Sequence, residues 1–143
     1  MTLVQRFAQV FGIIYLLVGV LGFVPPLLSG SFDDISGPFS GVLLSLFAVN
    51  WFHSLVHLVI GAVGLAAYRS FSGSKTYALA VGVIYAALFL LGMSGSGLQT
   101  LGGLLPLNWL DDVLHLLTAL VAFGAYFFSR SPEAGRGTTR SHA

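Results

Sequence analysis

The spacing of the charged residues constrains this chain more than any other feature. Four stretches contain no Asp, Glu, Lys or Arg: residues 7–32, 35–68, 76–110 and 113–129. A helix needs about 20 predominantly apolar residues to cross the hydrocarbon core of a bilayer. A charge at the centre of such a helix costs about 2.5–3.5 kcal/mol. Each stretch can hold one span, so the sequence predicts four transmembrane helices.

The composition agrees with a lipid solvent. Of 143 residues, 56% are hydrophobic and only 8% are charged, whereas an ordinary soluble domain is about 25% charged. The net charge of +1 gives no indication of a nucleic-acid partner, and the bilayer itself is the partner that the composition predicts. The absence of cysteine excludes disulfides, thiolate metal sites and a cysteine nucleophile.

Four helices are expected in one transmembrane domain over residues 1–130, which makes the predicted fold an all-α four-helix bundle. Their predicted ranges are about 3–24, 50–68, 74–93 and 108–129. The first helix ends where Pro25 and Pro26 cannot continue it. The polar residues 131–143 are expected to form a disordered cytoplasmic tail.

One apolar segment, GVLLSLFAV at residues 41–49, is too short to span a bilayer. It lies between the first and second predicted helices. We expect it to form either a short interfacial helix or one or two extra turns of the second helix.

The basic residues predict the orientation of the bundle. With four spans, all six fall on one side of the membrane: Arg6, Arg69, Lys75, Arg130, Arg136 and Arg140. The acidic residues that fall on the other side are Asp33, Asp34, Asp111 and Asp112. Lys and Arg in short loops mark the cytoplasmic face. The sequence therefore predicts a multi-pass protein of the bacterial inner membrane with both termini in the cytoplasm.

An internal repeat relates the two halves of the chain. The segment NWFHSLVHLVIGAVGLAAY at residues 50–68 aligns without gaps on NWLDDVLHLLTALVAFGAY at 108–126. The preceding helices also correspond, GIIYLLVGVLGF at 12–23 with GVIYAALFLLGM at 82–93. The prediction is two parallel copies of a helical hairpin, in residues 1–68 and 74–129, related by a pseudo-two-fold axis along the membrane normal.

An Asn-Trp pair begins the second and fourth predicted helices. Asn50 and Asn108 precede apolar runs, and Asn is a preferred N-cap residue. Trp51 and Trp109 follow them at the level where aromatic side chains line the membrane interface. We therefore predict structural roles, as caps and interface residues, for these four positions.

Four ionisable side chains must enter the membrane after these caps: His53, His57, Asp111 and His115. The repeat places Asp111 at the level of His53, and His115 at the level of His57. Ionisable residues in transmembrane segments usually face the bundle interior and pair with one another. We expect one buried His/Asp cluster near the outer face.

Several interpretations of this cluster remain open. It can be a hydrogen-bonded network that joins the second and fourth helices, because buried polar groups need partners. Three imidazoles and a carboxylate also suit a Zn, Cu or Fe ion. A b-type haem between His57 and His115 is a less favoured possibility, and a pathway for protons or small solutes is weaker still.

The function predicted from these features is that of a non-enzymatic structural or accessory membrane subunit, because no catalytic motif is present. Position 54 is Ser, so the Glu of the His-Glu-x-x-His protease motif is absent. Glycines on the first helix, such as Gly12, Gly19 and Gly22, can serve close helix contacts within the chain, with a membrane-protein partner or in a homo-oligomer. The alternative is a metal- or haem-binding redox or sensing protein that uses the His/Asp cluster.

The segments FAVNWFHSLVHLVIGAVGL at 47–65 and LLPLNWLDDVLHLLTAL at 104–120 resemble an uncharacterised bacterial family of small four-helix membrane proteins, a domain of unknown function. The family pattern is Asn-x-x-His-x-x-x-His-Leu in the second helix and Asn with a single His-Leu in the last. The matching residues are Asn50, His53, His57, Asn108 and His115. This chain has Trp51 where many members have Pro. The resemblance implies the four-span fold and supplies no activity, substrate or cofactor.

Overall fold

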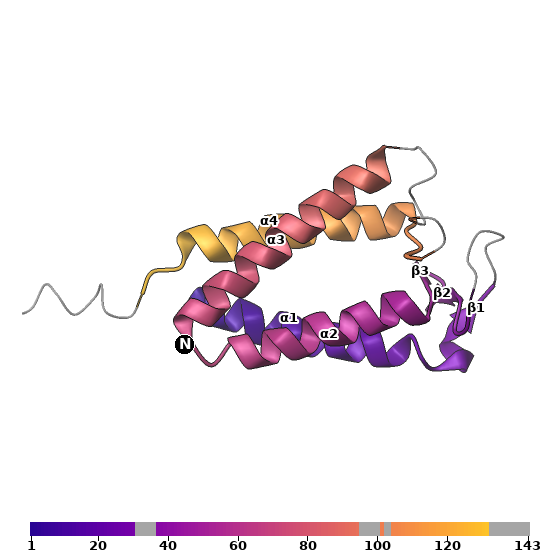
Figure 1. Cartoon of the computed structure of the whole chain (residues 1–143), viewed down its shortest axis with the longest axis horizontal. Helices are drawn as coiled ribbons and strands as arrows, with labels where there is room; N and C mark the ends of the chain where they lie inside the picture. The colour runs from indigo at the N-terminus through magenta and orange to yellow at the C-terminus, as the bar shows by residue number, and fades with distance from the viewer. Residues whose placement is uncertain (31–36, 95–100, 102–103, 132–143) are drawn as a thin grey trace, which may run out of the picture.

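The computed structural model describes residues 1–30, 37–94, 101 and 104–131 of the chain. It is mostly helical, with the four helices that the sequence predicts (Figure 1). They are α1 (Leu3–Leu21), α2 (Trp51–Ala67), α3 (Phe71–Met93) and α4 (Trp109–Phe128). Helices α1, α3 and α4 are long and apolar enough to cross a membrane, and α2 is a shorter apolar helix of 17 residues. By its apolar helices, the chain is a multi-pass membrane protein.

The helices pack as two consecutive pairs, α1 with α2 and α3 with α4. Figure 1 shows α3 and α4 lying above α1 and α2, with α3 rising away from α2 towards the end of the bundle that carries the β-strands. We call this end the sheet end. The two pairs therefore contact each other less than the helices within each pair do.

Small residues bring α1 and α2 close together. A Cβ atom added to Gly12 would lie 2.9 Å from the backbone nitrogen of Leu65, and one added to Gly19 would lie 2.8 Å from that of Leu58. Gly22 is also packed against α2, at Ser54. Gly12, Gly19 and Gly22 thus serve the close helix contacts within the chain, which is one of the roles that the sequence predicts for them.

The end of the bundle opposite the sheet is closed by polar contacts between helix ends. Ser129 Oγ accepts a hydrogen bond of 3.0 Å from the backbone N–H of Val4, and the Gln5 amide donates one of 3.2 Å to the carbonyl of Tyr68. The Lys75 ammonium donates to the carbonyl of Tyr126 near the C-terminus of α4. These bonds satisfy backbone groups that helix ends leave without an intrahelical partner.

Helix α3 begins at Phe71, three residues before the predicted start. The reason is a cap at Ser70, whose side chain accepts a 3.0 Å hydrogen bond from the backbone N–H of Gly73. At the sheet end of the bundle, α1 ends at Leu21 and a short 3-10 helix follows at Pro25–Leu27.

The prediction of a helix over residues 41–49 is wrong, because this segment forms a β-hairpin. Strands β1 (Leu28–Ser29), β2 (Gly41–Leu43) and β3 (Phe47–Val49) make a three-stranded antiparallel sheet in the order β1-β2-β3. The fold is therefore mostly helical rather than all-α.

Two local features explain this hairpin. Leu44 and Ser45 have φ values of 51° and 59°, in the left-handed region that turns the chain back on itself. The extended backbone of Asn50, together with its side-chain cap, starts α2 at Trp51 and stops it from continuing towards β3. The apolar pattern of this segment does not distinguish a short strand from a short helix.

The predicted polar tail at residues 131–143 lies outside the described residues after position 131, as do Asp33, Asp34, Arg136 and Arg140.

Candidate functional site

Two of the four predicted site residues bind the backbone of the sheet. We call His53 and Asp111 the sheet-level pair. His53 Nδ1 lies 3.0 Å from the carbonyl oxygen of Ala48 in β3, and because a carbonyl only accepts, Nδ1 is the donor. The Asp111 carboxylate accepts a 2.9 Å bond from the backbone N–H of Asn108 and a second bond from the backbone of Ala48. Both members of the pair therefore hold the same residue of β3.

This arrangement solves a problem that the hairpin creates. Strand β3 pairs with β2 along one edge only, and its residues Ala48 and Val49 are buried. Backbone N–H and C=O groups left unpaired inside a membrane protein cost several kcal/mol each. His53 and Asp111 supply partners for the backbone of Ala48 at the free edge of β3.

The two capping asparagines also connect the halves of the chain. Asn50 Oδ1 accepts from the backbone N–H of His53 at 2.9 Å, and its amide donates to the carbonyl of Leu104 at 3.1 Å. Asn108 Oδ1 accepts from the backbone N–H groups of Leu110 and Asp111, both at 3.0 Å, and its amide donates to the carbonyl of Leu46 at 2.8 Å. Each cap thus binds the segment that precedes the other capped helix.

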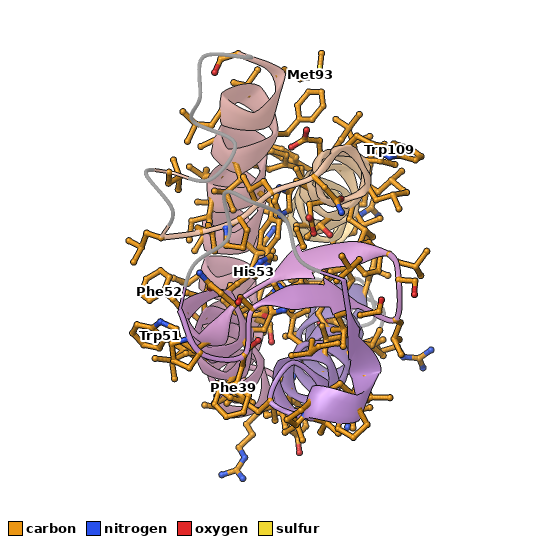
Figure 2. All side chains as sticks on the ribbon, turned by 90° about the vertical axis from the view of Figure 1, so that its right-hand side faces the viewer. Phe39, Trp51, Phe52, His53, Met93 and Trp109 are labelled. Atoms are coloured by element: carbon orange, nitrogen blue, oxygen red, sulfur yellow. The ribbon has the colours of Figure 1, made fainter. Side chains whose placement is uncertain are left out.

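The tryptophans that follow these caps point outwards. Figure 2 shows Trp51 and Trp109 on opposite sides of the bundle, with His53 between them towards the middle. Both indole side chains are exposed. This position fits the interfacial role that the sequence predicts.

The other two predicted site residues, His57 and His115, lie one helical turn further along α2 and α4. We call them the cavity-level pair. The ring of His57 meets the edge of Tyr15 with centroids 5.1 Å apart, and the ring of His115 meets that of Tyr85 at the same distance. Tyr15 and Tyr85 are themselves edge to face at 5.7 Å. The pair is therefore held by aromatic contacts rather than by each other.

The Nδ1 atoms of His57 and His115 differ from that of His53 in having no hydrogen-bond partner among the described residues. Both atoms are buried, and the side chain of His115 is only 4% exposed. Buried polar atoms in proteins are nearly always hydrogen-bonded. Ser54 Oγ and Asp112 Oδ1 also lack a partner among the described residues, but of these four residues only His57 and His115 line the cavity described next.

A cavity of about 270 Å³ adjoins the cavity-level pair. It lies between α1 and α4 and is bounded at the sheet end by the β2–β3 hairpin. Its polar lining residues are Tyr15, His57, Asp111, His115 and Thr118. Its apolar lining residues are Phe11, Ile14, Val18, Leu21, Leu43, Leu44, Phe47, Val49 and Leu114. A mostly apolar pocket with a few converging polar groups is the usual form of a small-molecule site.

The predicted four-residue cluster therefore consists of two pairs that differ in their hydrogen bonds, and the rings of His53 and His57 touch between the two levels with centroids 4.6 Å apart. Within the described part of the chain, no three His, Cys, Asp or Glu side chains are placed to hold one metal ion. The metal hypothesis thus gains no support from this geometry. The cavity is also smaller than the roughly 300–1,000 Å³ that drug-sized ligands occupy, and a haem is larger than such a ligand.

Two further polar residues of the cavity, Tyr15 and Thr118, are not among the predicted site residues. Their hydroxyl oxygens are 3.4 Å apart, and this contact joins α1 to α4 across the cavity. A sequence signal for Tyr15 does exist, because it recurs as Tyr85 in the aligned segments GIIY and GVIY. Thr118 has no such signal.

Comparison with known proteins identifies a family. Residues 5–128 match the domain of unknown function DUF4383. No curated protein and no solved structure matches the chain.

Proposed function

This chain belongs to the DUF4383 family, and we propose that it is a non-enzymatic accessory membrane protein that binds a small, mostly apolar molecule inside its helix bundle. The family description states no activity, so the proposal depends on the residues of the cavity.

The observation that carries the proposal is the cavity next to two unpartnered histidine nitrogens. A cavity of about 150 Å³ is large enough to bind benzene, and this one measures about 270 Å³. A bound molecule with a polar atom would give His57 or His115 the hydrogen-bond partner that the described residues do not provide.

A binding role fits these residues better than a catalytic one. Nucleophilic catalysis needs a hydroxyl or thiol within hydrogen-bond reach of a base. The Thr118 hydroxyl contacts the Tyr15 hydroxyl instead. Ser54 is buried against Gly22, and its oxygen has no partner among the described residues.

We also propose that the bundle consists of two parallel hairpin repeats with both termini in the cytoplasm of a bacterial inner membrane. The matched Tyr–His contacts at 5.1 Å and the reciprocal asparagine bonds support two equivalent halves. The positions of Arg6, Arg69 and Lys75 near helix ends opposite the sheet support the orientation. Cysteine labelling of the termini in intact cells and in inverted vesicles tests it.

The test of the binding function uses benzyl alcohol, a ring with one hydroxyl, and the protein in phosphatidylcholine nanodiscs. Binding is measured by saturation-transfer NMR against nanodiscs that contain no protein. The variant Val18→Phe places a larger side chain on the cavity wall, and we expect it to weaken binding at least about tenfold. Val20→Phe is the matched control, because Val20 is on the same helix but is exposed and outside the cavity lining. Equal binding by the two variants, or none by the wild type, would overturn the proposal.

A further inference from the structure

We propose that the natural occupant of the cavity is an uncharged, lipid-soluble molecule with a hydroxyl or carbonyl oxygen at one end, and that it enters sideways from the bilayer between α1 and α4. This inference rests on the proposed binding function and specifies its ligand class. Three observations support it: the exposure of the rim, the polar atoms inside, and the charges of the lining.

The rim of the cavity is apolar and exposed on the side of the bundle. Ile14 of α1 is 47% exposed, Leu44 of the hairpin 52%, and Leu114 of α4 44%. In a chain that crosses a membrane, exposed apolar side chains in the middle of helices face lipid. A molecule that reaches the cavity past these side chains comes from the acyl chains and not from water.

The polar atoms lie deeper, on residues that are less exposed than the rim. His115 is buried, and the Tyr15 and Thr118 hydroxyls meet at 3.4 Å. That distance is long for an O–H···O bond, whose usual range is about 2.5–3.0 Å. A ligand oxygen can bind both hydroxyls at normal length and can pair with the free histidine nitrogen.

The charges of the lining determine the kind of head group. Among the described residues around the cavity there is no Lys or Arg to neutralise a carboxylate or phosphate. Among the lining residues that the structure describes, the only acidic side chain is Asp111, and its carboxylate already accepts bonds from Asn108 and Ala48. A buried charge without a partner is costly, so a neutral oxygen is favoured over an ionised head group.

The size of the cavity limits how much of the ligand it encloses. At about 270 Å³ it has less than twice the volume of a cavity that holds one benzene, about 150 Å³. The head and the first part of the molecule fit inside. The remaining hydrocarbon passes between Ile14 and Leu114 into the bilayer.

The test is photolabelling in phosphatidylcholine nanodiscs with a twelve-carbon alcohol that carries a diazirine on its chain. Labelled residues are located by mass spectrometry, and we expect them on the cavity-facing sides of α1 and α4. Competitors of equal chain length are dodecanol, 2-dodecanone, dodecane and dodecanoate at pH 9. The alcohol and the ketone are expected to compete at concentrations about tenfold lower than the alkane and the carboxylate, because each hydrogen bond contributes about 3- to 10-fold in affinity.

The head-group assignment is tested by Tyr15→Phe combined with Thr118→Val, which removes two hydroxyls and nearly preserves shape. We expect about tenfold weaker competition by dodecanol and no change for dodecane. The control is Tyr77→Phe, which removes a hydroxyl bonded to the Ile60 carbonyl, outside the cavity lining. Equal competition by alkane and alcohol, or no effect of the double variant, would overturn the assignment.

The sideways route is tested by Leu114→Trp, which enlarges a rim side chain, with the exposed Leu117→Trp on the same helix as control. We expect Leu114→Trp to slow labelling by the long-chain probe at least about fivefold relative to Leu117→Trp. Unchanged labelling would overturn the route. If Val18→Phe weakens the binding of benzyl alcohol but no long-chain compound binds, the ligand class is wrong and the proposed binding function stands. If neither binds, both fail.

Discussion

The sheet-level pair and the cavity-level pair are one helical turn apart on the same two helices, yet their polar atoms are used differently. His53 and Asp111 are hydrogen-bonded to the backbone at Ala48. His57 and His115 are held by the rings of Tyr15 and Tyr85 and leave a nitrogen unpartnered among the described residues.

This difference predicts that the two pairs contribute unequally to the stability of the fold and to the proposed binding function. Partners that are hydrogen-bonded in a buried site stabilise the fold, and removing one leaves the other unsatisfied at a cost of about 1–3 kcal/mol. A buried group without a partner carries its desolvation cost already, so replacing it with an apolar ring can be neutral or favourable. Similar substitutions should therefore lower the free energy of unfolding at the sheet-level pair and leave it nearly unchanged at the cavity-level pair.

The largest effect is expected for Asp111→Ala. The backbone N–H of Asn108 and the backbone of Ala48 would lose their acceptor in a buried site, which should reduce the free energy of unfolding by about 2–4 kcal/mol. Steric trapping in lipid bicelles measures this quantity. Asp111→Asn keeps one acceptor oxygen and should lose less than half as much. A loss below about 0.5 kcal/mol for the alanine variant would show that Asp111 does not stabilise the fold in the way proposed for the sheet-level pair.

The most direct comparison of the two levels replaces each histidine by phenylalanine. His53→Phe removes the donor to the Ala48 carbonyl and should cost about 2 kcal/mol of unfolding free energy. His115→Phe removes a nitrogen without a partner and keeps a ring against Tyr85, so its cost should be about 0–0.5 kcal/mol.

The same two variants should rank in the reverse order for binding. His115→Phe should weaken the binding of benzyl alcohol, whereas His53→Phe should leave it within about twofold after correction for the unfolded fraction. The distinction between the pairs would be lost if both variants lost the same free energy of unfolding. It would also be lost if the variant with the larger loss of unfolding free energy were the one that bound benzyl alcohol more weakly.

A smaller effect is expected at the two caps. Asn50→Ala and Asn108→Ala each remove a helix cap and a bond to the other half of the chain, and each should cost about 1–2 kcal/mol. Because both caps hold the same junction between the halves, the double variant should cost less than the sum, by about 0.5–1 kcal/mol. Additive losses would show that the two halves are joined independently at each cap.

Much of the fold can be predicted from the sequence because its causes are local. Uncharged stretches long enough to span a bilayer predict the helices, and the Asn residues before α2 and α4 do occupy the N-cap positions. The hairpin over residues 41–49 could not be predicted in this way. It depends on positive φ values at Leu44 and Ser45, which neither residue type favours, and on partners for β3 from distant helices.

The candidate site was predictable in position more than in chemistry. Helical spacing and the repeat point to the positions of His53, His57, Asp111 and His115. They do not reveal that His53 and Asp111 form hydrogen bonds with the backbone of β3, because that segment was expected to be helical. The cavity needs the separation of α1 from α4, and this depends on packing between the two helix pairs.

The smallest effect concerns the hairpin that both pairs border. Ser45 has a φ of 59°, which glycine adopts without strain, and within the described part of the chain its hydroxyl bonds only to Ser29, at an exposed site. Ser45→Gly should therefore raise the free energy of unfolding by about 0.5 kcal/mol, since relief of the backbone strain exceeds the loss of an exposed hydrogen bond. Ser29→Ala removes the same bond together with the bond that Ser29 Oγ donates to the Val42 carbonyl, without changing the turn, and therefore sets an upper limit on that loss. Benzyl alcohol binding should stay unchanged in both variants, because the turn supports the strand that the sheet-level pair holds and adds no polar atom to the cavity. A change in binding with Ser45→Gly would mean that the turn also shapes the part of the cavity wall that Leu44 forms.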